Sequence, residues 1–267
     1  MSEFAPDSFL VSGIHASPNF GARNGCDRAD SIILHYTGLR LGDAEAAWRS
    51  DPGGQALQWL INPVAQVSSH YLIFEDGRIV QLVAEAQRAW HAGRSSWAGV
   101  TDMNSHSIGI EIANAGHDGG LPAFPDVQID AVIALCRDIS ERRRIAPERI
   151  LAHSDIAPGR KIDPGERFPW DRLYAEGVGH WVEPVPISGG RFLAQGDEGQ
   201  PVEALQAMFA MYGYGATVTG VFDPETEQIV AAFQRHFRPS RVDGIADSST
   251  ILTLRNLIAA LEASATV

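Results

Sequence analysis

Residues 151–165 constrain the chain most, because they concentrate possible ligands between residues that break regular structure. The segment reads LAHSDIAPGRKIDPG. His153 closes a short apolar run that predicts the end of a strand, and Asp163 precedes Pro164, which biases the aspartate towards an extended backbone. These side chains can converge on one point, and zinc accepts both as ligands, although a catalytic zinc takes three. If only His153 and Asp163 are considered, the alternative to a metal site is an ordinary core histidine beside a solvated charged loop.

Composition places the chain among ordinary globular proteins and narrows its partners. It has 267 residues, enough for one large domain or a large one with a small one. Its net charge of −12 argues against a nucleic-acid partner held through phosphates. The two cysteines, Cys26 and Cys136, form no CxxC pair, so neither a disulfide scaffold nor a thiolate metal site is expected. Cys136 falls on an apolar helical face and is predicted to be core.

No stretch of the sequence is long and apolar enough to predict a transmembrane segment. The first residues, MSEFAPDSFLVSG, lack the basic and apolar regions of a Sec signal peptide. The sequence is therefore compatible with a cytoplasmic location, with export by another route, or with a leader that has been trimmed. It leaves the oligomeric state open.

The third ligand is predicted on a strand. Residues 31–37, SIILHYT, form a β-branched apolar run that ends at Gly38, which indicates a buried strand. His35 lies at its C-terminal end, where open α/β sheets place their ligand sites. The alternative for His35 is a hydrogen-bonded core histidine beside Tyr36.

A carboxylate is predicted on a second strand, over residues 107–112. In SIGIEI the three isoleucines share one face, so Glu111 projects from the opposite face. Glu111 then lies either on a solvated face or in a cleft. Gly109, on the same face, leaves room for another group to approach.

The remaining elements follow from periodicity and turn residues. Residues 126–144 have the strongest helical period and are predicted to begin with Asp126 as the cap. The other predicted elements are a helix over 43–49 capped by Asp43, strands over 68–74 and 78–83 joined by an Asp-Gly turn, and a short helix near 168–174.

Three boundaries divide the chain. Residues 1–29 are predicted to be an ordered arm with little regular structure, and residues 30–176 a catalytic domain. Residues 177–190, GVGHWVEPVPISGG, lose all periodicity and predict a linker. Residues 191–267 contain three amphipathic helical stretches, so they predict a small three-helix domain. The linker suggests that a chain ending near Glu176 would fold alone, and packing of the small domain against the large one is the alternative.

Together these residues describe a hydrolytic zinc site. His35, His153 and Asp163 supply two imidazoles and a carboxylate and leave one coordination position open. Zinc makes a bound water nucleophilic near neutral pH. Glu111 is suited to accept and return protons. Lys161 precedes Asp163 by two residues, so it points to the same side and can stabilise an oxyanion.

The strings ILHYTG, SSHYLI, AWHAG, SIGIEIAN and AHSDIAPGRKIDPG resemble the amidase-2 family of zinc-dependent N-acetylmuramoyl-L-alanine amidases, of the AmiD/AmpD type. The resemblance covers roughly residues 30–175. It implies an α/β fold with a central mixed β-sheet flanked by helices. It also implies cleavage of the amide between N-acetylmuramic acid and L-alanine in peptidoglycan or muropeptides. By motif, the zinc ligands fall on His35, His153 and Asp163, and the catalytic residues on Glu111 and Lys161.

The matching strings contain two more histidines and a tryptophan. The substrate cleft is predicted to be lined by His70, Trp90 and His91. The alternative for the two histidines is a role as additional metal ligands. The alternative for the AWHAG loop is packing at the edge of the core. The remaining histidines considered, His106, His117, His180 and His236, have no motif and are predicted to lie on the surface.

The segment after residue 190 resembles the three-helix peptidoglycan-binding domain of cell-wall hydrolases, on the strings EALQAMFAMYGYG, TGVFDPETEQIVAAFQRHF and VDGIAD. That resemblance favours the cell envelope or periplasm, while the absence of a visible signal peptide keeps the cytoplasm possible. The competing function is a non-catalytic peptidoglycan-recognition protein on the same scaffold. Such a protein typically lacks one zinc ligand, and this sequence has all three.

Overall fold

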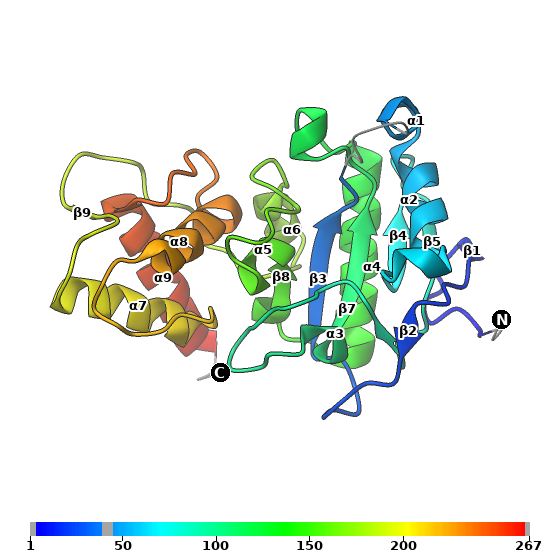
Figure 1. Ribbon diagram of the computed structural model, residues 1–267, viewed down its shortest axis with the longest axis horizontal. Coiled ribbons are helices and arrows are strands. Elements are labelled where there is room, and N and C mark those ends of the chain that lie inside the picture. Colours follow the sequence, from blue (N-terminus) through cyan, green and yellow to red (C-terminus); the bar gives the residue numbers. More distant parts are fainter. Residues whose placement is uncertain (1–3, 39–44, 265–267) are drawn as a thin grey trace.

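A mixed β-sheet forms the centre of the computed structural model, which describes residues 4–38 and 45–264 (Figure 1). Within these residues the sheet has six strands in the order β1-β5-β4-β7-β3-β8. In that order, the bounds are Gly13–Ile14, Ile79–Gln81, Tyr71–Ile73, Ser107–Ile112, Ser31–Tyr36 and Ile150–Ala152. Strands β4 and β5 are antiparallel, and the other neighbours are parallel. The predicted mixed sheet is therefore confirmed.

The two faces of this sheet have different coverings. The isoleucines of β7 pack against the long helix α4 (Asp126–Arg143), whose Ile129 and Val132 belong to the same apolar cluster. On the opposite face, α1 (Glu45–Ser50) and α2 (Pro52–Leu60) cover β4 and β5 through a second cluster that contains Trp48 and Leu72. Glu111 projects to this second face, beside a cavity rather than a packed helix.

Short elements complete the larger domain. Strands β2 (Phe20–Gly21) and β6 (Arg88–Ala89) pair, and the remaining helical turns are α3 (Met103–His106), α5 (His153–Ile156), α6 (Trp170–Ala175), η1 (Pro63–Ala65), η2 (His117–Gly119) and η3 (Pro147–Arg149). No helix in the described ranges combines the length and the hydropathy that a membrane span requires.

Several predicted elements differ from the structure in their limits. The strand predicted over 68–74 is reduced to β4. The His70 carbonyl accepts the backbone N–H groups of both Leu82 and Val83, which interrupts the regular pairing with β5, and the Ser68 N–H donates to the Trp90 carbonyl at 3.1 Å. Helix α4 has Pro125, not Asp126, at its N-cap position. The predicted arm contributes β1, which extends the sheet at its edge. The predicted cap Asp43 lies outside the described residues.

The C-terminal domain contains the helices α7 (Gln200–Tyr212), α8 (Pro224–Phe237) and α9 (Ser248–Ser264), as the periodicity predicts. Asp223 caps α8, because its carboxylate accepts the backbone N–H of Thr226 at 2.8 Å. A short antiparallel pair, β9 (Phe192–Leu193) and β10 (Ala246–Asp247), joins the start of this domain to the segment between α8 and α9. Strands of two residues have no detectable periodicity, so the sequence did not indicate them.

The two domains share one hydrophobic core. Trp97 of the larger domain is 2% exposed, and its ring lies 4.9 Å from that of Tyr214 in an edge-to-face contact. The backbone N–H of Ala98 donates to the carbonyl of Gly213 at 2.7 Å. Buried residues of both domains belong to a single apolar cluster. This packing supports the alternative in which the small domain folds against the large one, because separation would expose aromatic side chains to water.

We therefore expect the full-length protein to unfold in one cooperative transition, and Trp97→Ala to destabilise both domains together. Truncation of a buried tryptophan typically costs about 3–5 kcal/mol. Calorimetry with fluorescence and circular dichroism should show a single transition whose free energy of unfolding falls by that amount. The exposed Phe9 offers a matched control, since Phe9→Ala should change stability by less than about 0.5 kcal/mol. Two separate transitions in the wild-type protein would contradict the shared core.

Candidate metal and catalytic site

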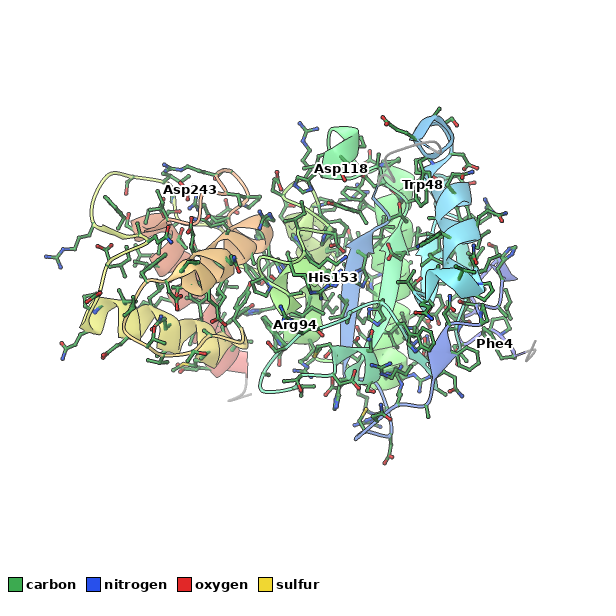
Figure 2. The ribbon with its side chains drawn as sticks, viewed as in Figure 1. Phe4, Trp48, Arg94, Asp118, His153 and Asp243 are labelled. Carbon is green, nitrogen blue, oxygen red and sulfur yellow. The ribbon has the colours of Figure 1, made fainter. Side chains whose placement is uncertain are left out.

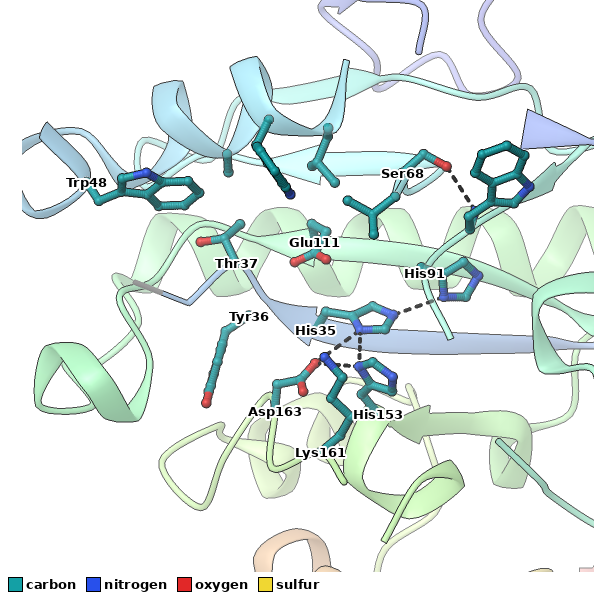
Figure 3. Close-up of a pocket in the computed structure, with 15 residues that line it drawn as sticks. His35, Tyr36, Thr37, Trp48, Ser68, His91, Glu111, His153, Lys161 and Asp163 are labelled. Atoms are coloured by element: carbon teal, nitrogen blue, oxygen red, sulfur yellow. Dashed lines mark hydrogen bonds and ion pairs between the residues drawn. The ribbon is translucent and has the colours of Figure 1, made fainter. Parts of the chain in front are cut away.

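Three ligand atoms converge at the C-terminal ends of β3 and β8 (Figure 3). The Nδ1 atoms of His35 and His153 lie 2.8 Å apart, and the Asp163 Oδ2 lies 3.1 Å and 2.9 Å from them respectively. All three side chains are buried. Two ring nitrogens and a carboxylate oxygen that face one another in a buried position are a suitable donor set for a cation such as zinc. The sequence-predicted ligands are thus brought together, and His153 lies centrally in the molecule (Figure 2).

The protonation states of these groups suit a metal. Burial, and the neighbouring His153, lower the pKa of His35 to about 4, so its imidazole is neutral at pH 7. Burial would raise the pKa of Asp163, but the hydrogen bonds and charges of His153 and His35 outweigh it and hold that pKa well below its usual range. A neutral imidazole and an ionised carboxylate are the forms that coordinate metals.

The orientation of His153 is set by a backbone carbonyl. Its Nε2–H donates to the carbonyl of Ala92 at 3.2 Å. The proton therefore resides on Nε2, and the lone pair of Nδ1 points towards His35 and Asp163. Metal-binding histidines commonly have their second ring nitrogen held in this way.

His35 is oriented by a chain of side chains that begins with His91. The Ser107 hydroxyl donates to the carbonyl of Met103, so it can accept the Nε2–H of His91 at 3.3 Å. The Nδ1 of His91 then accepts the Nε2–H of His35 at 3.0 Å. This sequence of donors leaves the Nδ1 of His35 unprotonated and available to a metal. Gly109 permits the arrangement, because a Cβ at that position would collide with the His91 ring.

The loop that carries Asp163 closes onto α5. The backbone N–H of Ser154 donates to the Asp163 carbonyl at 3.0 Å, and the N–H of Lys161 donates to the Ala157 carbonyl at 3.0 Å. The side chain of Lys161 lines the same cavity as Asp163 and Glu111. A cation from Lys161 is therefore available beside the ligand atoms.

Glu111 faces the ligands from β7. It pairs with His35 across the parallel ladder, so the two side chains share one face of the sheet. Its Oε2 is buried and has no hydrogen-bond partner among the described residues. Burial, and then the charge of Asp163, raise the pKa of Glu111 to about 8, against the opposing effect of Lys161. An unpartnered carboxyl with a pKa near neutrality is well suited to proton transfer.

The ligands open into a cavity of about 260 Å³. Trp90 and His91, predicted to line the cleft, do line this cavity. Further lining residues were not singled out from the sequence: Tyr36, Thr37, Trp48, Ala56, Trp59, Leu60, Val67 and Ser68. Three of these residues had a usable signal, since Tyr36 and Thr37 directly follow His35 in ILHYTG and Ser68 begins SSHYLI.

Two histidine predictions are wrong. His70 is fully buried and is not part of the cavity lining; its Nδ1 accepts the backbone N–H of Gly109, and its Nε2 lies 3.0 Å from the Gln87 carbonyl. His236 was predicted to lie on the surface but is only 2% exposed, since it stacks between Trp170 and its neighbour Phe237 with centroid distances of 3.7 Å. Gly109 and Trp170, which help to bury His70 and His236 respectively, are distant from them in sequence, so local polarity gave no indication of burial.

Known proteins share both parts of this architecture. Residues 26–166 match the N-acetylmuramoyl-L-alanine amidase family, and residues 198–254 match a peptidoglycan binding domain family. The N-acetylmuramoyl-L-alanine amidase AmiD of Escherichia coli strain K12 is 40% identical over 84% of this chain and 80% of its own.

Solved structures agree with the sequence comparison. The complex of E. coli AmiD with anhydro-N-acetylmuramic acid-L-Ala-D-gamma-Glu-L-Lys superposes with a TM-score of 0.70 at 33% identity, over 91% of this chain and 98% of that one. AmpDh3 of Pseudomonas aeruginosa, in complex with an anhydromuramic pentapeptide, gives a TM-score of 0.69 at 30% identity, over 98% of this chain and 99% of that one. The chain therefore belongs to the N-acetylmuramoyl-L-alanine amidase family.

Proposed function

We propose that this enzyme hydrolyses the amide between the lactyl group of N-acetylmuramic acid and L-alanine, with a zinc ion held by His35, His153 and Asp163. The observation that carries the proposal is the convergence of three buried ligand atoms beside the unpartnered oxygen of Glu111. The AmiD and AmpDh3 structures with muramyl peptides support this class of substrate. A non-catalytic recognition protein would have no need of a carboxyl with a raised pKa at this position.

Each residue of the site has a distinct part in the proposed reaction. When bound, zinc supplies Lewis acidity, which makes water nucleophilic near neutral pH and polarises the scissile carbonyl. In its ionised form, Glu111 accepts the proton of the attacking water and returns it to the nitrogen of L-alanine as the amide bond breaks. Lys161 offers positive charge to the oxygen that becomes anionic during attack. Trp90 and the tryptophans of α1 and α2 offer apolar walls for the sugar and the peptide.

The C-terminal domain is proposed to bind peptidoglycan. Its match to a peptidoglycan binding domain family supports this role. A binding site tethered to a catalytic site raises the effective concentration of that catalytic site on a polymer. This role favours action at the cell envelope.

Removal of a ligand should abolish metal binding. Wild-type protein should contain about one zinc per chain and release free peptide from muropeptides, as detected by mass spectrometry, and a chelator should stop the release. His35→Ala should lose both zinc and activity. His106→Ala is a matched control, because His106 lies on α3 near Asp30 and is not part of the cavity lining. Full zinc content and activity in His35→Ala would refute the metal site.

Glu111→Gln should separate proton transfer from metal binding. The amide keeps the shape of the carboxyl but cannot accept a proton, so turnover should fall by about 10²–10⁴-fold while zinc content is retained. Glu225→Gln, on the exposed first turn of α8, is the control and should retain wild-type turnover. Near wild-type turnover in Glu111→Gln would show that Glu111 is only a strand carboxylate.

Wall binding can be measured with the full-length Glu111→Gln protein, which should not cut its target. This variant should co-sediment with purified sacculi, and saturating soluble muropeptide should fill the catalytic cleft without releasing it. Release of all bound protein by the muropeptide would assign binding to the cleft instead of the C-terminal domain.

A further inference from the structure

One buried carboxylate connects the C-terminal domain to the segment that carries the ligand His153. Asp155 lies on α5, two residues after His153, and is 0% exposed. Its side chain accepts three hydrogen bonds within the part of the chain that the structure describes. The donors are the backbone N–H of Ala152 at 2.8 Å, the hydroxyl of Tyr214 at 2.7 Å and the Nδ1–H of His236 at 2.6 Å.

Two of these three donors come from the C-terminal domain. A buried carboxylate is costly unless its oxygens are hydrogen-bonded, and removal of one partner leaves an uncompensated polar group. Tyr214 and His236 therefore stabilise Asp155 in this position. The aromatic cluster fixes both donors, since Tyr214 packs on Trp97 and His236 stacks on Trp170.

The bond from Ala152 to Asp155 fixes the turn between β8 and α5. Helix α5 has four residues, too few to be stable in isolation. His153 is its first residue, so the direction of its imidazole depends on how this turn is fastened to its surroundings.

Other contacts at the same boundary support the turn. The backbone N–H of Ser96 donates to the carbonyl of Ile156 at 2.8 Å, and the loop of Ser96 also contains Ala92, whose carbonyl orients His153. Gly159 lies so close to α8 that a Cβ there would collide with Gln228. In Figure 1, α8 lies directly beside α5.

We propose that Tyr214 and His236 are positioning residues for the metal site: through Asp155 they hold α5 in the conformation that presents His153. The C-terminal domain then contributes to metal affinity as well as to wall binding. This inference rests on the proposed zinc site. It requires no contact between the C-terminal domain and the substrate or the metal.

The test compares two tyrosines of the C-terminal domain whose hydroxyl groups have different hydrogen-bond partners. Tyr214→Phe removes only the hydroxyl that donates to Asp155. Tyr212→Phe is the matched control. It removes a hydroxyl from the same aromatic cluster, but that hydroxyl is hydrogen-bonded to His180 Nδ1 at 2.8 Å. Zinc dissociation constants are measured on full-length proteins at neutral pH by competition with a chromophoric chelator. Hydrogen exchange of the Ala157 amide, which closes the turn of α5 onto the His153 carbonyl, is followed in the metal-free proteins.

We expect Tyr214→Phe to weaken zinc binding about tenfold, at the lower end of the 10–100-fold effect of residues that orient metal ligands. Exchange at Ala157 should be faster in Tyr214→Phe and unchanged in Tyr212→Phe. His236→Phe keeps the stacking but removes the donor, so it should weaken zinc binding further, and His236→Asn should recover part of it. A purely structural role would lower the stability of both tyrosine variants and leave their zinc affinities equal.

Zinc affinity in Tyr214→Phe equal to that in Tyr212→Phe would overturn the inference while leaving the proposed function intact. A wild-type protein that binds no zinc would overturn the proposed function and this inference with it. If His236→Phe does not fold, Tyr214→Phe still decides the question, because it removes a single oxygen atom.

Discussion

The parallel pairing of β3 with β7 on one side and β8 on the other is the constraint on which the site depends. The register places His35 opposite Glu111 and Leu34 opposite Ala152. Because parallel strands end at the same edge of the sheet, His153, which follows β8, lies near His35, the penultimate residue of β3. A slip of one residue would turn His35 to the face covered by α4. The apolar packing of α4 on the isoleucines of β7 therefore also fixes the chemistry of the opposite face.

Most of this arrangement could be predicted from the sequence, because it is encoded locally. Alternation along residues 107–112 put Glu111 opposite the isoleucines, and the apolar run before His35 indicated a strand end. The parts that sequence patterns missed depend on distant partners. His70 is buried by a contact with Gly109, and His236 by stacking on Trp170, and neither contact leaves a periodic signal. The two-residue strands β1, β9 and β10 were also too short to be detected.

One cavity shifts the pKa values of two carboxyl groups in opposite directions. Both are desolvated, but the imidazoles of His35 and His153 contact Asp163 and depress its pKa, whereas Glu111 has no such partner and its pKa rises to about 8. Asp163 is therefore held as an anion, whereas the pKa of Glu111 lies near neutrality, which suits the proton transfer proposed for it. Such divergent environments are how carboxylates acquire different roles in one site. The two pKa values differ because the carboxyl groups have different neighbours: the loop that closes onto α5 holds Asp163 against the histidines, whereas β7 holds Glu111 away from such partners.

The shared core gives the small domain a structural role in this protein, in addition to the proposed binding of peptidoglycan. A flexibly tethered binding domain would contribute only effective concentration, and its loss would leave the catalytic domain unchanged. Here the aromatic residues of α7 and α8 complete the core next to α5, and their polar atoms satisfy Asp155. The segment that carries His153 is thus folded partly by residues more than fifty positions further along the chain. Displacement of the small domain would remove two of the three hydrogen-bond donors of Asp155, the carboxylate that also accepts the backbone N–H of Ala152 beside His153.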